Sequence, residues 1–407
     1  MRAAGASGRQ ATPQTLPRRL RQLSSRHVVP TISFPRILGR ACTRVHPGRR
    51  MMHTCAKPGF ELGQESARRA FVTAADVARR AGVSRSAVSR AFTPGASVST
   101  QARERILSAA DHLGYRVNRL AQSLTNARSN LIGLVGTDLQ QPFHAEFLTT
   151  LSAALLADGF QCMLLNAANA QRDMSALIAR VLEYRVFAIV VMTGSPPARI
   201  VEECLNNGVP VILVNKLLPG LAVDTVLADH AAGGRLAAGH LLNAGCRRLV
   251  VISSAARTAS LVGRIEAFRT RAAGAGVPVR LWEDGPTDYR SGWSAAMAVL
   301  AEEPFDGVFC VTDLLALGFL DAARAKFGRR VPDDLSVIGF DDIPQAGWDA
   351  YRLTTFRQPV ESLTGVVMDV LRRRREHGAP PHALTTVPVE LVVRSTVRGL
   401  VAEELAC

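Results

Sequence analysis

The sequence lacks the features that mark several common classes of protein. Its seven cysteines are scattered, odd in number and free of CxxC spacing, so neither a disulfide framework nor a zinc site is indicated. No apolar run is long enough to cross a bilayer, and the N-terminus has no apolar signal-peptide core. We therefore expect a cytoplasmic protein with reduced cysteines and no membrane partner.

Motifs of catalysis are missing too. The chain contains no GxxxxGK[ST] phosphate loop, no HExxH metal site and no GxSxG nucleophile elbow. Gly274 and Gly276 begin like a dinucleotide fingerprint, but Val277 and Pro278 follow at once and break the pattern. The sequence therefore favours a binding protein over an enzyme, and it predicts no catalytic residue, metal site or cofactor.

Acidic residues are absent from residues 1–60, which hold eleven Arg and one Lys. This segment supplies +12 of the formal net charge of +15. Residues 71–128 carry nine basic and three acidic side chains, or +6, which leaves about −3 for residues 129–407. The inference of a nucleic-acid partner therefore rests on the second segment rather than on the overall isoelectric point.

Residues 1–70 are rich in Arg, Ser and Pro with few periodic apolar positions, so we expect them to be disordered. Three interpretations remain open. The segment is a leader similar to a transit peptide, a basic arm that adds unspecific phosphate contacts, or the product of a start codon placed too early. We favour the last, because Met51 and Met52 lie just ahead of the first recognisable domain.

Residues 71–117 predict a helix-turn-helix followed by a third helix. Thr73 with Asp76 three residues on is a capping box, so a first helix should begin near Ala74. Gly82 supplies the turn, and Ser84 is placed to cap a second helix over about 85–92.

The third predicted helix begins after Ser99 and ends at Gly114. Its core stripe is Ile106, Ala110 and Leu113.

The second predicted helix has two distinct faces. Arg85, Ser86, Ser89 and Arg90 fall within one arc of the helical wheel, whereas the opposite arc is apolar. The polar arc has no carboxylate, and its guanidinium groups suit phosphates or guanine edges in the major groove. We expect base readout from Arg85 and Ser86, with Ser89 and Arg90 on bases or backbone. The alternative is a solvated helical hairpin that binds no nucleic acid.

With the short segment that follows, these residues resemble the lac repressor family of bacterial regulators. The matching positions include Thr73, Asp76, Val77, Ala78, Ala81, Gly82, Val83, Ser84, Val88, Ser89, Arg90, Val98, Ser99, Arg103, Gly114, Tyr115, Asn118, Ala121 and Leu124. The chain departs from the family at Ala87, where Thr is usual, and at Val117, where Pro is common.

The resemblance adds DNA-binding roles outside the second helix. It implies that residues 118–128 form a hinge helix whose Leu124 enters the minor groove as an apolar wedge, with Asn118 and Ala121 beside it. We also count Thr73 and Ser84 among the DNA-binding residues.

From Leu131 onward short apolar runs alternate with amphipathic segments. The predicted strands are 131–136, 161–165, 187–192, 210–214, 248–252, 307–311, 335–339 and 387–393. The predicted helices are 143–157, 171–184, 197–207, 229–244, 259–274, 289–301, 313–327 and 359–376. This alternation predicts two successive α/β units with parallel sheets covered by helices on both faces.

The α/β part also resembles the two-lobed effector domains of the lac repressor family, which share the periplasmic sugar-binding fold. Further matches are Gly263-Arg264, the stretch Val331 to Asp342, and Leu353 to Gln358. The expected fold is therefore an N-terminal all-α DNA-binding domain plus a two-lobed α/β domain over residues 129–400. Lobe 1 should comprise about 129–228 and 358–386, lobe 2 about 229–357 and 387–400, with 401–407 as a tail.

Open parallel sheets bind ligands at the carboxyl ends of their strands, so we expect an effector site between the lobes. The candidate residues are Asp138, Phe143, His144, Met192, Asn215, Asp229, Ser260, Arg264, Thr287, Thr312 and Asp341. Gln141, Thr193, Lys216, Asp288 and Asp313 follow strands in the same way. The resemblance implies that Arg264 forks onto ligand oxygens and that Asp341 is a ligand-binding carboxylate.

Together these observations predict a transcriptional regulator, in the first place a repressor, that binds pseudo-palindromic operator DNA under control of a sugar or sugar acid. We expect a homodimer or a tetramer, because paired half-sites multiply affinity. A solute-binding receptor is the competing interpretation, but it would require an export signal and no DNA-binding domain.

Overall fold

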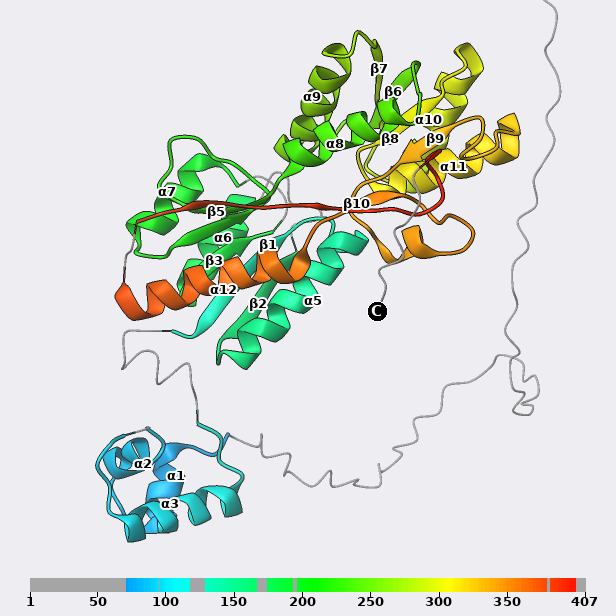
Figure 1. Ribbon diagram of the computed structural model, residues 1–407. Coiled ribbons are helices and arrows are strands. Elements are labelled where there is room, and N and C mark those ends of the chain that lie inside the picture. The colour runs from blue at the N-terminus through cyan, green and yellow to red at the C-terminus, as the bar shows by residue number, and fades with distance from the viewer. Residues whose placement is uncertain are drawn as a thin grey trace, which may run out of the picture. The chain divides into compact units, whose positions relative to one another are not determined.

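The computed structural model describes residues 71–93, 95–117, 129–166, 174–192, 196–378 and 381–399 (Figure 1). The expected N-terminal extension, the hinge segment with Asn118, Ala121 and Leu124, and the C-terminal tail lie outside the described residues, as does Thr193.

The N-terminal unit has the three predicted helices, α1 (Ala74–Ala81), α2 (Arg85–Ala91) and α3 (Thr100–Leu113). Thr73 and Asp76 form the capping box at α1, and Ser84 and Ser99 cap the next two helices through their hydroxyl oxygens. Gly82 ends α1 in the left-handed conformation that a residue without Cβ adopts freely. The predicted boundaries are confirmed to within one residue.

A small apolar core holds the three helices together. It is built from Val77, Ala78, Ala81, Val88, Ala91, Ile106, Ala109 and Ala110. The guanidinium of Arg103 on α3 donates hydrogen bonds to the backbone carbonyl oxygens of Ala91 and Ala96, at 2.5 and 3.1 Å. These bonds fix the end of α2 against α3, so the opposite face of α2 is held in one orientation.

Lobe 1 is a six-stranded parallel sheet in the order β11-β5-β4-β3-β1-β2. Its strands are β1 (Leu131–Gly136), β2 (Gln161–Asn166), β3 (Ala188–Val191), β4 (Val211–Val214), β5 (Asp224–Ala228) and β11 (Leu384–Val387). Its helices are α5 (Pro142–Ala157), α6 (Met174–Glu183), α7 (Ala198–Asn206) and α12 (Val360–His377).

Helices cover both faces of this sheet, as predicted, because successive strand residues point to opposite sides. Ala188 and Val190 of β3 belong to the core that includes α5 and α12. Their neighbours Ile189 and Val191 belong to the core that includes α6 and α7. The helices therefore cover the two faces of the sheet and leave the carboxyl ends of these strands uncovered.

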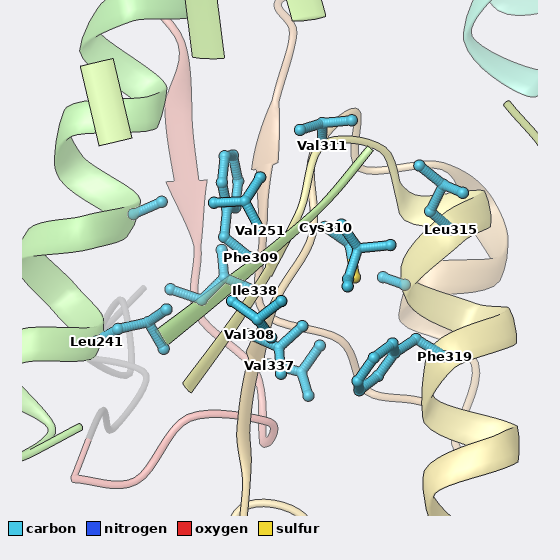
Figure 2. Close-up of a cluster of buried hydrophobic side chains, with 14 of the residues drawn as sticks. Leu241, Val251, Val308, Phe309, Cys310, Val311, Leu315, Phe319, Val337 and Ile338 are labelled. Atoms are coloured by element: carbon cyan, nitrogen blue, oxygen red, sulfur yellow. The ribbon is translucent and has the colours of Figure 1, made fainter. Parts of the chain in front are cut away.

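Lobe 2 is a four-stranded parallel sheet in the order β7-β6-β8-β9. Its strands are β6 (Leu249–Ser253), β7 (Val279–Glu283), β8 (Gly307–Cys310) and β9 (Ser336–Ile338). Its helices are α8 (His230–Asn243), α9 (Ala259–Ala273), α10 (Tyr289–Glu302) and α11 (Asp313–Phe327). Figure 2 shows Leu241 of α8 and Phe319 of α11 packing from opposite sides onto the strand residues between them.

The chain passes between the lobes at three places: from β5 to α8, from β10 (Thr355–Arg357) to α12, and from β11 to β12 (Glu390–Val392) (Figure 1). The predicted continuous strand 387–393 is therefore wrong. Pro388 has no backbone N–H to continue a ladder, so β11 ends in lobe 1. β12 then pairs antiparallel with β10. β5 (Asp224–Ala228), β7 (Val279–Glu283) and β10 (Thr355–Arg357) were not predicted, because polar or charged residues interrupt their apolar pattern.

A buried ion pair holds helix α12, where the chain has come back from lobe 2, against the sheet of lobe 1. Arg374 of α12 and Asp224 at the start of β5 are 7% and 2% exposed, and Arg374 Nε donates to Asp224 Oδ2 at 2.7 Å. The other oxygen of Asp224 accepts from the backbone N–H of Ala383 at 3.0 Å, next to β11. The Asp224 carboxylate at the start of β5 therefore holds both α12 and the residue before β11. Arg374 of α12 lies 150 residues after Asp224 in the sequence.

None of the described helices combines the length and the apolar character needed to span a bilayer. The described residues also contain no group of three metal-ligating side chains.

We predict that Asp224→Ala lowers the free energy of unfolding by about 3–5 kcal/mol, because it leaves the buried Arg374 without an anionic partner and, among the described residues, with only His382 Nδ1 within hydrogen-bond distance. The control is Asp369→Ala on the exposed side of α12, where the carboxylate is 68% exposed and pairs with Arg372. That change should alter stability by less than about 1 kcal/mol. Urea unfolding followed by circular dichroism measures both, and equal losses would contradict the assignment.

Candidate functional site

The exposed face of α2 has the composition expected of a DNA-reading surface. Arg85, Ser86, Ser89 and Arg90 are all exposed, and Val88 is fully buried on the opposite face. No ion pair involves Arg85 or Arg90 among the described residues, so neither guanidinium is neutralised by a neighbouring carboxylate. Two available guanidinium groups with two hydroxyls suit a surface that contacts phosphates and base edges.

Thr73 and Ser84 play a local structural part. The Thr73 hydroxyl donates to Asp76 Oδ2 at 2.7 Å, and this hydrogen bond lowers the pKa of Asp76 although partial burial opposes the shift. Ser84 Oγ accepts the backbone N–H of Ala87 at 3.2 Å and lies 2.8 Å from Ser86 Oγ. Both residues are exposed at helix N-termini, which are positions that favour an anion.

A cavity of about 410 Å³ lies between residues of the two lobes. Its lining comprises Glu146, Val360 and Glu361 from lobe 1, Asp341, Asp342, Ile343, Pro344 and Arg394 from lobe 2, and Arg357 and Gln358 at the crossing between them. Asp341 is the single predicted effector residue in this lining. The other predicted effector residues are not part of this lining.

Five side chains form a closed hydrogen-bond ring across the lobes. Gln358 Nε2 donates to Asp341 Oδ1 at 2.7 Å, and Asn215 Nδ2 donates to Gln358 Oε1 at 2.9 Å. Asn215 Oδ1 lies 3.1 Å from His230 Nε2, and His230 Nδ1 lies 3.3 Å from Arg264 Nε. Arg264 Nη1 closes the ring 3.4 Å from Asp341 Oδ1. We name these five residues the interlobe ring.

The protonation states in the interlobe ring follow from which atom donates and which accepts in each hydrogen bond. His230 Nδ1 accepts from Arg264, so Nε2 carries the proton and donates to Asn215 Oδ1. Burial and then the Arg264 charge hold the pKa of His230 well below its usual range, consistent with a neutral imidazole. Burial raises the pKa of Asp341 to about 6, although the Arg264 charge and the Gln358 hydrogen bond oppose this rise.

Arg264 is 3% exposed and is held on three sides. Its Nη1 donates to the carbonyl oxygen of Val311 at the end of β8, and its guanidinium carbon lies 3.5 Å from the centre of the Phe340 ring. Gly234 of α8 permits this close packing, because a Cβ there would lie 2.2 Å from the Arg264 backbone oxygen. Burial lowers the pKa of Arg264, and Asp341 opposes that shift.

The backbone at Asp341 adopts a conformation that L residues rarely use, with φ of 123°, and Asp342 follows with φ of 57°. Asp342 stabilises this turn, since it accepts from Arg357 Nε at 2.8 Å and from Arg394 Nη2 at 2.6 Å. Strained backbone of this kind is concentrated at ligand-binding sites.

The predicted residues of lobe 1 lie around the end of β1 and the start of α5. His144 Nδ1 donates to the carbonyl oxygen of Asp138 at 3.2 Å, and Asp138 has a φ of 49°. Phe143 stacks on Phe147 at a ring distance of 6.4 Å and packs against the lobe 1 core. Met192 is 5% exposed within the same core.

The predicted residues of lobe 2 are mostly engaged by protein groups. Asp229 Oδ1 caps α8 by accepting from Ala232 N at 2.8 Å. Ser260 Oγ donates across the lobes to the carbonyl oxygen of Asn215 at 2.9 Å. The Thr287 hydroxyl lies 2.6 Å from Ser254 Oγ, and its carbonyl oxygen accepts from Gln141 Nε2 of lobe 1 at 2.9 Å.

Asp313 is a structural group. It is fully buried and accepts from Thr355 Oγ1 at 2.6 Å and from Ile343 N at 2.9 Å. Burial, reinforced by the Asp341 charge, raises its pKa to about 7.

Two buried hydroxyls at neighbouring strand ends have no hydrogen-bond partner among the described residues. They belong to Ser253 at the end of β6 and Thr312 just after β8, which are 0% and 8% exposed. A buried hydroxyl without a partner costs about 1–3 kcal/mol, so a ligand hydroxyl that reached it would recover that free energy.

Sequence reasoning selected Thr312 but missed Ser253, His230 and Gln358. The signal for Ser253 was its place at the end of a buried strand. His230 directly follows Asp229, and Gln358 lies in a stretch that supported the family resemblance without being assigned a role.

Two family models match the chain. "Bacterial regulatory proteins, lacI family" matches residues 73–118, and "Periplasmic binding protein-like domain" matches residues 238–397. Among similar solved structures, a lac repressor dimer bound to operator has a TM-score of 0.74 at 24% identity and covers 81% of this chain and 100% of that chain. That likeness shows the fold. A CelR–cellobiose complex has a TM-score of 0.60 at 28% identity and covers 80% of this chain and 99% of that one.

Curated relatives show the same relationship over most of their length. The regulator CelR of Thermobifida fusca is 32% identical over 320 residues, which cover 76% of this chain and 91% of CelR. The repressor PurR of Erwinia tasmaniensis is 31% identical over 292 residues, which cover 70% of this chain and 85% of PurR. The chain therefore belongs to the lacI family of bacterial regulatory proteins and is a DNA-binding transcriptional regulator.

Proposed function

We propose that this protein represses transcription by binding a pseudo-palindromic operator as a homodimer, and that a sugar or sugar acid held between the lobes controls this binding. The observation that carries the proposal is the exposed, carboxylate-free face of α2, with Arg85 and Arg90 unpaired among the described residues. A regulator of this kind acts on the bacterial chromosome in the cytoplasm.

On this proposal α2 enters the major groove. Arg85 and Ser86, in the first turn, contact base edges, while Ser89 and Arg90 contact bases or backbone. Thr73 and Ser84 place helix N-termini toward phosphates. Leu124, with Asn118 and Ala121, acts at the minor groove.

The effector site comprises the interlobe ring and the strand ends around it. Arg264 and Asp341 would bind ligand oxygens, and Thr312 would donate to or accept from a ligand hydroxyl. Asp138, Phe143, His144, Met192, Asn215, Asp229, Ser260 and Thr287 form the surrounding boundary. The sugar class is supported by similar solved regulators, one in complex with cellobiose and one with bound ribose. A ligand that replaces hydrogen bonds of the ring changes how the two lobes are joined. Such a ligand binds one arrangement of the lobes more tightly than the other, and this difference is what control of DNA binding requires.

The function is tested by selecting duplexes from random DNA with the purified protein. We expect a palindromic consensus, bound at least about 1,000-fold more tightly than random DNA at physiological salt. Fluorescence anisotropy measures both affinities. A protein that showed no preference for any selected duplex would contradict the proposal.

Replacing Arg85 with Ala should relax preference at one position in each half-site, with a loss of about 1–3 kcal/mol for the preferred base. The check is anisotropy against the selected operator and its single-base variants. Arg199→Ala, an exposed arginine of lobe 1, is the matched control and should leave the pattern unchanged. A uniform loss over all sequences would instead assign Arg85 to a phosphate.

Replacing Thr312 with Val should leave the free energy of unfolding unchanged or raise it by about 1 kcal/mol, because the lost hydroxyl has no protein partner. Thr396→Val is the control. Thr396 is 1% exposed, and its hydroxyl donates to Val337 O at 2.7 Å and accepts from Thr354 N at 2.9 Å. The control should lose about 1–3 kcal/mol in urea unfolding. A comparable loss at Thr312 would show that its hydroxyl is already used by the protein.

A further inference from the structure

Lys216 lies at the boundary between the lobes. It directly follows Asn215, which ends β4 with a φ of 55° and belongs to the interlobe ring. The carbonyl oxygen of the Asn215–Lys216 peptide accepts the cross-lobe hydrogen bond from Ser260 of α9. Arg264 is one helical turn further along α9. The backbone of Lys216 is therefore fixed beside the helix that carries the buried guanidinium.

The Lys216 ammonium is partly buried but has no hydrogen bond or ion pair with any described residue. The two buried cations among the described residues are both paired, Arg264 with Asp341 and Arg374 with Asp224. Burial lowers the pKa of Lys216 to about 8, and no carboxylate opposes the shift. An ammonium that is partly withdrawn from water and has no anionic partner is stabilised by a bound anion.

The surroundings of Lys216 are electropositive. The charges of Lys216 and Arg264 both lower the pKa of His144, so the three groups share one region at the lobe boundary, although burial has the larger effect on His144. Asp341 accepts from Arg264 and Gln358, and Asp229 caps α8. Asp138 acts on His144 in the opposite sense, and no carboxylate contributes to the pKa of Lys216. The Lys216 ammonium is therefore a cation that no neighbouring carboxylate neutralises.

The choice of lysine itself is informative. The 49 basic residues of the chain include only three lysines, at positions 57, 216 and 326. Arginine therefore carries nearly all of the positive charge of this chain, and lysine differs from it in presenting a compact ammonium with three donors.

We propose that the effector of this regulator is anionic, a small hydroxylated metabolite with a carboxylate or a phosphate, and that Lys216 is the side chain that recognises the anionic group. The inference rests on the proposed function, since it specifies the ligand of the same interlobe site. The hydroxyls of the metabolite face Thr312 and the interlobe ring, and its charge pairs with the ammonium.

The test uses the full chain and ligands that share a hydroxyl pattern but differ in charge. Glucose is compared with gluconate, glucuronate and glucose 6-phosphate, and ribose with ribonate and ribose 5-phosphate, by calorimetry at pH 7. We expect binding by at least one anion and at least tenfold weaker binding by its neutral parent. The carboxylate and phosphate arms identify which group is recognised. Failure of every anion, or equal binding of parent and anion, would overturn the proposal.

Lys216→Met provides the second measurement. It should weaken the anion by at least tenfold while raising the melting temperature of the ligand-free protein, because it removes a buried charge without a partner. A lysine with a merely structural role would lower the melting temperature instead. Lys326→Met, at an exposed position of α11, is the matched control and should change neither value. A lower melting temperature for Lys216→Met, or unchanged anion affinity, would refute the role of Lys216.

The outcomes also separate this inference from the function on which it rests. If the protein selects an operator and a neutral sugar changes that affinity, the anionic effector is refuted and the regulatory function stands. If no operator is selected but the anion binds through Lys216, the repressor function fails and the ligand assignment stands.

Discussion

The closed hydrogen-bond ring between the lobes is the interaction on which the effector domain depends. Lobes of this kind are joined by thin chain crossings, and His230 and Gln358 of the ring lie at two of the three crossings. Each neutral link contributes only about 1 kcal/mol, but a closed network within a buried region is cooperative. Its single carboxylate, Asp341, and its single guanidinium, Arg264, are neighbours that form an ion pair, so the ring neutralises its own charge.

The hydrogen bonds within the interlobe ring limit which protein groups a ligand can bind. Arg264 is already engaged by Val311, His230, Asp341 and Phe340, so a ligand must compete for its donors or bind beside it. Groups that the protein leaves without partners are the ones that gain most. Near the ring these include the hydroxyls of Thr312 and Ser253 and the ammonium of Lys216. On the proposed function, specificity would therefore reside at the margin of the ring, and the ring would respond to the bound ligand.

The sequence predicted much of the fold because its signals were local. The caps Thr73, Ser84 and Ser99 and the periodic apolar runs fixed nearly every helix to within a few residues. The interrupted segment around Pro388 was misjudged, because its two strands belong to different sheets. The site was harder to predict. Strand ends indicate which residues approach the boundary, but whether a side chain caps a helix, as Asp229 does, or remains unpaired, as Lys216 does, depends on partners far away in sequence.

The most direct measurement of the central claim is operator affinity with and without a saturating effector, made on the natural protein and on a Gln358→Leu variant that opens the interlobe ring. The account predicts that the effector changes operator affinity by about 5–150-fold in the natural protein, the usual range of coupling between two sites. In the variant this ratio should fall toward one. An equal ratio in both proteins would contradict the claim that the ring transmits ligand binding to DNA.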